Sequence, residues 1–303
     1  MEYHKPVLLE ECINHLNINP KGTYVDVTFG GGGHSREILK HLSAEGKLFA
    51  FDQDSDAEAN IPDAENFKLL ATNFRHLKAF LRREKITSVD GILADLGISS
   101  HQIDEPSRGF SLRFDGPLDM RMNTQKPKTA ADVVNNYSED ELTRVFKVYG
   151  EQPKAKFMAR AIANYRVSKP INTTTDLKEA LQNFAPKFRD GKFWAPVFQA
   201  IRIEVNEEME ALQEMLLQAG ELLAEDGRFV VMSYHSLEDR LVKNYMKFGN
   251  LEGEPEKDFY GNLLRPLEPI TRKPIIANEE ETQMNPRARS AKLRVAKKLP
   301  TNG

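Results

Sequence analysis

The sequence predicts a doubly wound α/β sheet interrupted by an inserted, all-helical domain. The first hundred residues alternate short apolar strands with helical stretches, the rhythm of βαβ units around a parallel sheet. Four consecutive glycines, 30–33, follow the first predicted strand, and a polar residue closes most of the others. The central third of the chain shows helix signatures without a convincing strand.

Five short apolar runs are predicted to form the sheet. They cover residues 24–27, 48–51, 68–71, 91–94 and 229–232. A helix over 35–42 follows the glycines, and another over 212–223 precedes the last strand. Because the strand–helix rhythm stops near residue 105 and resumes near 205, we predict one discontinuous domain, 1–104 with 205–303.

The segment 105–204 is predicted to fold as a helical substrate-recognition insertion. Ser138 and Glu141 form a capping box for one helix. The apolar stripe of that helix is Leu142, Val145, Phe146 and Tyr149. A second helix is expected to open at Pro153. Its expected apolar side consists of Phe157, Ala161 and Tyr165. The tail from Pro255 is rich in proline and charge, so we expect little regular structure there.

Composition excludes several classes of protein. The chain has 303 residues, 40% hydrophobic and 29% charged, and no apolar run near the ~20 residues of a membrane helix. Its first residues lack a signal-peptide pattern, which predicts a cytoplasmic protein without membrane contact. The single cysteine, Cys12, excludes an internal disulfide, a multi-cysteine zinc site and a thiolate-held iron–sulfur cluster. No metal site is expected.

The segment from Asp26 to His34 is the strongest local signal. Glycines between a strand and a helix let the backbone approach a ligand closely, because no Cβ intervenes. The ligand is either a dinucleotide pyrophosphate or the aminoacyl and ribose part of S-adenosylmethionine. A flexible loop is the simpler alternative, but the position directly after a strand favours a cofactor.

Two further strand ends carry candidate cofactor contacts. Asp52 closes the second strand, where a carboxylate can accept both ribose hydroxyl hydrogens. NAD enzymes also bind ribose through a carboxylate at this position. The alternative role of Asp52 is to cap the N-terminus of a helix. Phe74 follows the next strand and is expected either to pack on adenine or to belong to the core. Asp95 and the polar loop to Gln102 follow the strand beside the cofactor, where a capped turn is the alternative.

A basic stretch lies within the predicted insertion. Residues 153–203 contain ten Lys or Arg and three Asp or Glu, a local excess that the net charge of −3 conceals. Phe157, Tyr165, Phe193 and Trp194 are interspersed, as in surfaces that stack on unpaired bases. A solvated helix face is the alternative. The candidate RNA-binding residues are Lys154, Lys156, Arg160 and Arg166, with Arg287 and Arg289 in the tail.

These motifs together resemble the RsmH (MraW) family of bacterial small-subunit rRNA methyltransferases. The resemblance runs nearly end to end. Its segments are His4–Leu9, Asp26–Ser35, Val89–Ser100, Arg108–Ser111, Asp115–Met122, Phe198–Arg202, Ser233–Arg240 and Asn285–Arg294. Several of them are long and idiosyncratic, so chance does not explain the match.

The resemblance implies a Rossmann-like methyltransferase sheet and transfer of a methyl group from S-adenosylmethionine to N4 of a cytidine. It places that cytidine in the decoding region of small-subunit (16S) rRNA. By position, the implied cofactor contacts are Gly32, Gly33, His34, Asp52, Phe74, Asp95 and Gln102. Cytosine N4 is a poor nucleophile, so an acceptor for its hydrogens assists attack, and Asp95 is the candidate catalytic residue. The implied partner is small-subunit rRNA or the small subunit, and a homodimer is left open.

Two other functions stay open at this point. An NAD-type oxidoreductase shares the glycine loop and Asp52. A non-catalytic rRNA-binding assembly factor would share the basic surface. Binding of NAD but not S-adenosylmethionine would favour the first, and RNA binding without methyl transfer would favour the second.

Overall fold

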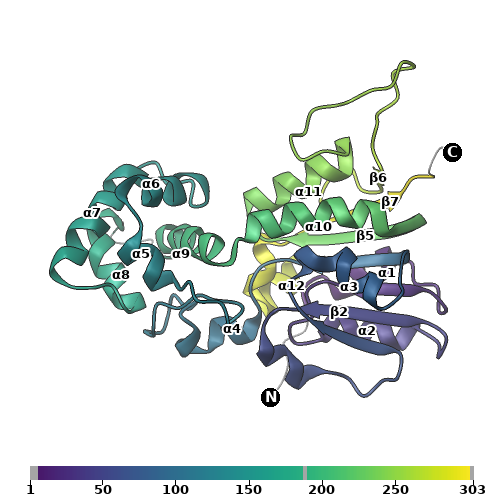
Figure 1. The fold of residues 1–303 in the computed structure, drawn as a ribbon, viewed down its shortest axis with the longest axis horizontal. Helices are drawn as coiled ribbons and strands as arrows, with labels where there is room; N and C mark the ends of the chain where they lie inside the picture. The colour runs from purple at the N-terminus through teal and green to yellow at the C-terminus, as the bar shows by residue number, and fades with distance from the viewer. Residues whose placement is uncertain (1–5, 187–189, 301–303) are drawn as a thin grey trace. The chain divides into compact units, whose positions relative to one another are not determined.

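The computed structural model describes residues 6–186 and 190–300, and the chain divides into two compact units (Figure 1). One unit combines residues 1–97 with 209–303, and the other comprises residues 98–208. Two residues of the N-terminal motif, His4 and Lys5, lie outside the described residues. No helix in the described ranges is long and apolar enough to cross a membrane.

The first unit is built on a seven-stranded sheet with the order β3-β2-β1-β4-β5-β7-β6. The strands are β1 (Thr23–Asp26), β2 (Lys47–Asp52), β3 (Phe67–Ala71), β4 (Val89–Asp95), β5 (Leu223–Ser233), β6 (Leu267–Pro269) and β7 (Lys292–Lys298). Neighbours from β3 to β5 pair parallel, whereas β7 pairs antiparallel with both β5 and β6. The chain reverses its direction across the sheet between β1 and β4, which confirms the predicted doubly wound fold.

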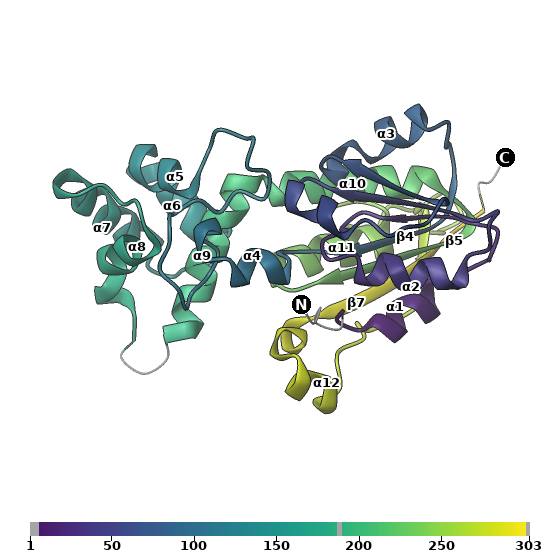
Figure 2. The same ribbon diagram turned by 90° about the horizontal axis from the view of Figure 1, so that it is seen from below.

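Helices cover both faces of this sheet. They are α1 (Leu9–Leu16), α2 (Gly33–His41), α3 (Leu77–Arg83), α10 (Glu208–Leu222) and α11 (Ser236–Phe248). A short further helix, α12 (Glu279–Met284), precedes β7 and has no buried residue. Figure 2 shows α1 and α2 on one face and α3 and α10 on the other. Between this face and α1 and α2 lies an apolar cluster in which Leu16, Tyr24, Ile38 and Leu93 are nearly or fully buried. Because both faces are covered, the central strands are apolar along most of their length.

The second unit is helical, as predicted. Its helices are α4 (Ser100–Asp104), α5 (Ala130–Asn136), α6 (Glu139–Val148), α7 (Ala155–Ser168), α8 (Thr174–Leu181) and α9 (Asp190–Asn206). Ser138 and Glu141 form the predicted capping box at the start of α6. The predicted stripe of α6 is buried, with Leu142, Val145 and Phe146 fully enclosed and Tyr149 8% exposed.

The expected apolar side of α7 is wrong. Phe157 is 64% exposed, while Ala155, Met158, Ala159 and Ile162 are buried. The helix also begins at Ala155 rather than at Pro153. Small residues and methionine fill the space against the neighbouring helices, and the large aromatic ring is left in solvent.

The expectation of an irregular tail is also wrong. β7 completes the sheet beside β5, and Leu293, Val295 and Ala296 are at most 1% exposed. The charges that suggested a surface segment lie on the other side of the strand, where Arg294 and Lys292 pair with Asp239 at 2.7 and 3.3 Å. A strand that lies between β5 and β6 and alternates apolar and cationic residues therefore resembles a solvated tail in sequence.

Candidate active site

Polar side chains close four neighbouring parallel strands at one edge of the sheet. Asp26 ends β1, Asp52 ends β2, Asp95 ends β4 and Ser233 ends β5. Strand pairing is in register, since Asp26 lies opposite Leu93 and Asp95 lies opposite Met232. Open α/β sheets bind their ligands at this edge, beside the point where the strand order reverses.

Asp26 organises the loop that follows β1. Its side chain is 1% exposed, and its Oδ1 accepts a hydrogen bond from the Thr28 amide at 3.0 Å. Its Oδ2 accepts one from the Ser35 hydroxyl at 2.7 Å. Burial raises the pKa of Asp26 above its ordinary value. Because its oxygens are engaged within the loop, Asp26 acts as a structural brace between β1 and α2.

The glycine loop is required by the packing of the chain itself. Gly32 has φ +73°, and a Cβ there would lie 2.9 Å from the Phe29 ring. A Cβ on Gly33 would lie 2.3 Å from Pro6 Cγ. In the described part of the chain no side chain caps the N-terminus of α2, so its first amides can meet an anionic group. The loop thus combines close packing with an open helix end.

Asp52 bridges the loop and the end of β2. Its Oδ2 accepts a hydrogen bond from the Gly30 amide at 2.7 Å, and its Oδ1 accepts one from the Asp54 amide at 2.9 Å. Burial raises its pKa to about 6. Each oxygen keeps a further lone pair, so the carboxylate is placed as a diol acceptor at the strand end.

Asp95 is held by groups from two other segments. Its Oδ1 accepts a hydrogen bond from the Tyr234 hydroxyl at 2.7 Å, and its own amide donates to Thr28 Oγ1 at 2.7 Å. Burial raises the pKa of Asp95 to about 6, although the hydrogen bond from the Tyr234 hydroxyl opposes the rise. About a quarter of the side chain remains exposed. The carboxylate is therefore oriented, partly desolvated and accessible.

His34 lies beside Asp95 with one ring nitrogen unsatisfied. Its Nδ1 is 3.9 Å from Asp95 Oδ2, and its Nε2 is buried without a hydrogen-bond partner among the described residues. Burial lowers the pKa of His34, so the ring is neutral near pH 7 and forms no true ion pair with Asp95. A buried polar atom without a partner is uncommon and fits a contact that a bound ligand completes.

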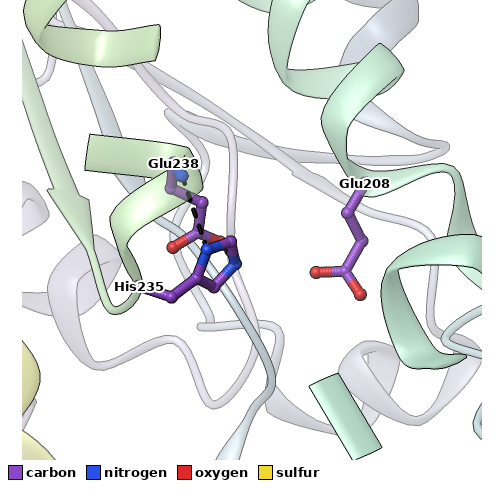
Figure 3. Close-up of side chains that lie close together, drawn as sticks. All are labelled: Glu208, His235 and Glu238. Atoms are coloured by element: carbon purple, nitrogen blue, oxygen red, sulfur yellow. Dashed lines mark hydrogen bonds and ion pairs between the residues drawn. The ribbon is translucent and has the colours of Figure 1, made fainter. Parts of the chain in front are cut away.

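The start of α11 supplies residues that sequence reasoning did not single out. Figure 3 shows His235 and Glu238 there, while Glu208, also drawn, belongs to the other unit. Glu238 is 3% exposed, and its Oε2 accepts a hydrogen bond from the Tyr234 amide at 2.9 Å. Its own amide donates to His235 Nδ1 at 3.4 Å, so His235 caps the helix. His235 Nε2 lies 3.1 Å from Glu238 Oε1, at an angle that makes no hydrogen bond.

These contacts give Tyr234 a fixed place against Asp95. In the sequence, Tyr234 was marked only by the Ser233–Arg240 segment of the family resemblance, which assigned it no role. Its pKa is raised well above the ordinary value by burial and by the charge of Asp95. The hydroxyl therefore stays protonated and serves as a donor.

Phe74 and Gln102 remain predicted cofactor contacts with clear local roles. Phe74 is half-buried at the start of a short 3₁₀ helix, Phe74–His76, after β3. Gln102 is 5% exposed and completes a capping box with Ser99 at the start of α4. The capped turn considered as an alternative for this loop is thus present. Gln102 belongs to the second unit.

The candidate RNA-binding cations differ in their surroundings. Lys154 and Lys156 are exposed at the start of α7. Arg160 pairs with Glu139 at 3.2 Å, and Arg166 donates to the Val134 carbonyl at 2.7 Å. Both arginines therefore also hold the helices of their unit together. In the tail, Arg287 is half-buried and Arg289 exposed within a 3₁₀ helix, Pro286–Ser290.

The expected aromatic partners of these cations differ in how much of their rings is exposed. Trp194 is 8% exposed and packs edge-to-face on Phe193, with ring centroids 4.9 Å apart. Tyr165 donates its hydroxyl to Glu179 at 2.6 Å. Phe157 is the member of the set with a largely exposed ring.

The fold and the site define a nucleotide-cofactor enzyme with a doubly wound sheet. Its hydrogen-bonding groups fit S-adenosylmethionine, since the open end of α2 suits a carboxylate and Asp52 suits a ribose diol. His34 Nε2 also lacks a partner among the described residues. The model of the MraW methylase family matches residues 1–299. The chain belongs to this family and is an S-adenosylmethionine-dependent methyltransferase, as predicted.

Individual relatives agree with this assignment. The chain is 55% identical over 298 residues to ribosomal RNA small subunit methyltransferase H of Cytophaga hutchinsonii, covering 98% of this chain and 99% of that protein. It is 56% identical over 299 residues to the protein of the same name in Flavobacterium johnsoniae, covering 99% of each. Among solved structures, an rRNA methylase from Streptococcus thermophilus is 12% identical with a TM-score of 0.42, covering 96% of this chain and 94% of that one. The assignment rests on the sequence matches.

Proposed function

We propose that this methyltransferase modifies N4 of a cytidine in the decoding region of small-subunit rRNA. The names of its relatives, which match over nearly their full length, support small-subunit rRNA as the substrate. The observation that carries the choice of atom is the oriented carboxylate of Asp95 at the carboxyl end of β4. The proposed enzyme acts in the cytoplasm, where small subunits are assembled.

The chemistry proposed is direct displacement. When bound, S-adenosylmethionine supplies a methyl group already activated by its sulfonium. The N4 lone pair forms the new N–CH₃ bond, the C–S bond breaks, and one N4 proton is lost. Asp95 accepts a hydrogen bond from the amino group, which favours a pyramidal attacking nitrogen, and it offers a base for the proton. The Tyr234 hydroxyl keeps the Asp95 carboxylate in one orientation.

The state of Cys12 supports nitrogen rather than C5 of a pyrimidine as the target. Methylation at C5 requires a thiolate that adds to C6. Cys12 is fully buried in α1, and burial raises its pKa well above the ordinary value. The chain contains no other cysteine. An amino group requires only alignment and an acceptor for its hydrogens.

We further propose that residues 98–208, close to the insertion expected at 105–204, recognise the RNA. Lys154, just before α7, and Lys156, in its first turn, supply exposed cations, and Phe157 supplies an exposed ring beside them. Cations on phosphates and a ring on an unpaired base are a common combination in RNA-binding surfaces. Cytosine must leave its stack to be methylated, and an exposed ring on this surface can stack on a base that has become unpaired.

The test is incubation of unmodified small subunits with labelled S-adenosylmethionine, followed by nucleoside analysis. N4-methylcytidine is expected from the wild-type protein. The Asp95→Ala variant should lose at least 99% of the rate, roughly 2.7 kcal/mol of transition-state stabilisation. The Cys12→Ala variant should keep its activity. Detection of C5-methylcytidine, or of a covalent adduct with a fluorinated cytidine, would overturn the proposal.

A further inference from the structure

A hairpin at 250–265, between α11 and β6, presents two adjacent aromatic rings to solvent. Phe259 is 95% exposed and Tyr260 is 86% exposed, with their ring centroids 5.6 Å apart and nearly perpendicular. Figure 1 shows this segment as a long loop that projects away from the sheet. Large aromatic side chains are usually buried, at least in part, so a neighbouring pair at a loop tip marks a candidate contact surface.

The tip of the 250–265 hairpin is held in one conformation by Asp258. Its Oδ1 accepts hydrogen bonds from the amides of Tyr260 and Asn262, at 2.9 and 2.8 Å. Its Oδ2 accepts one from Asn262 Nδ2 at 3.0 Å. Asp258 also donates its amide to the Asn262 carbonyl at 2.9 Å, and Leu264 donates to the Glu256 carbonyl at 2.9 Å one rung below. A preformed tip lowers the entropy cost of binding.

The base of the hairpin is equally defined. Asn244, in α11, donates from Nδ2 to the Leu251 carbonyl at 3.0 Å. Asn250 donates from Nδ2 to the Glu254 carbonyl at 2.7 Å and accepts from the Gly253 amide at 2.9 Å. The exposed rings are therefore displayed on an anchored scaffold rather than on a loose loop.

The charge of the hairpin decides between the classes of partner. Glu252, Glu254 and Glu256 are exposed, with Lys257 as the exposed cation between them and the tip. Arg265 is engaged at the base, where it donates to the Lys247 carbonyl at 3.2 Å. An acidic rim repels a phosphate backbone and attracts a positively charged surface. These glutamates therefore favour a protein, rather than RNA, as the binding partner of the hairpin.

We propose that the 250–265 hairpin docks this enzyme on a protein with a positively charged surface that forms part of its ribosomal substrate. Phe259 and Tyr260 are the apolar anchors, and the three glutamates are the charged rim. Exposed aromatic anchors with a polar rim are typical of protein interfaces. The inference rests on the proposed function, because it requires the small subunit, which contains both RNA and protein, to be the substrate.

The experiment compares binding to unmodified small subunits with binding to the protein-free rRNA extracted from them. The double variant Phe259→Ser/Tyr260→Ser should bind subunits about tenfold more weakly and bind rRNA as the wild type does. Phe157→Ser, a matched loss of an exposed ring in the second unit, should weaken both. Unchanged affinity for S-adenosylmethionine shows that the hairpin variant is folded, and unchanged hydrogen exchange in α5–α8 shows the same for Phe157→Ser.

A charge reversal gives the sharpest discrimination. Glu252→Lys/Glu254→Lys/Glu256→Lys should weaken binding to subunits if the hairpin meets a basic protein. Tighter binding to subunits or to rRNA would show that the hairpin faces phosphate and would overturn the inference. Wild-type binding by both hairpin variants would do the same, provided that the wild-type protein methylates subunits. If it does not, the proposed function itself has failed.

Discussion

Asp95 is held where its charge is disfavoured, although the proposed reaction needs that charge. Its pKa of about 6 lies above the ~3.9 of an unfolded chain, mainly because of burial. A carboxyl pKa raised by folding contributes stability that is fully present below the unfolded pKa and is lost as the pH rises through about 6. Activity should have the opposite dependence and rise through the same pH range, because the acceptor is the ionised form.

The Asp95→Asn variant separates these two effects. It should abolish methyl transfer and raise the free energy of unfolding at pH 8 by about 1–2 kcal/mol, less than the full shift implies because the side chain is partly exposed. The gain should be smaller at pH 5, where the folded wild-type carboxyl is mostly protonated. Urea unfolding at the two pH values measures it. A variant less stable than the wild type at pH 8 would mean that the hydrogen bond from Tyr234 to the carboxylate outweighs the cost of burying the charge of Asp95.

At the scale of single elements, α7 carries the proposed RNA contacts. The Lys154→Glu/Lys156→Glu variant should lower RNA affinity and flatten the log–log salt dependence by about 1.4–1.8, since two phosphate contacts are lost. Arg82→Glu/Lys243→Glu places the same charge change on exposed residues of the first unit and should leave RNA affinity close to that of the wild type. Filter binding over a range of salt concentrations measures both. An unchanged salt slope in the α7 variant would identify this surface as a solvated face.

At the same scale, the position of β7 in the sheet could not be predicted from the sequence, because its pairing with β5 joins segments that are about sixty residues apart. The strand Lys292–Lys298 pairs with β5 and buries Leu293 completely. Leu293→Ala should therefore destabilise the protein by about 2–4 kcal/mol. Ile276→Ala removes a comparable side chain that is 66% exposed and should change the stability by less than about 0.5 kcal/mol. Chemical denaturation compares the two, and equal effects would mean that β7 contributes little to the sheet.

Across the whole molecule, the features that could be predicted from the sequence are those that depend on a short stretch of residues. The strands and the carboxylates at their ends follow from apolar runs and fixed spacing, as do the caps of α6. The contact between Tyr234 and Asp95 could not be predicted, because the two residues are 139 positions apart and meet only through the pairing of β4 with β5. The exposure of Phe157 escaped prediction for a similar reason, since packing between helices overrode the periodicity of one helix.

The division into two units implies that a ligand stabilises them unequally. A ligand that binds one cooperative unit raises the stability of that unit by about 2.7 kcal/mol at a free concentration of 100 times its Kd. Hydrogen exchange followed by mass spectrometry should therefore show S-adenosylmethionine protecting β1, β2, β4 and α2, with little change in α5–α8. The same measurement with NAD should show no protection, which also tests the oxidoreductase alternative. Equal protection of both units would show that they unfold together, and protection confined to α5–α8 would move the cofactor site away from the glycine loop.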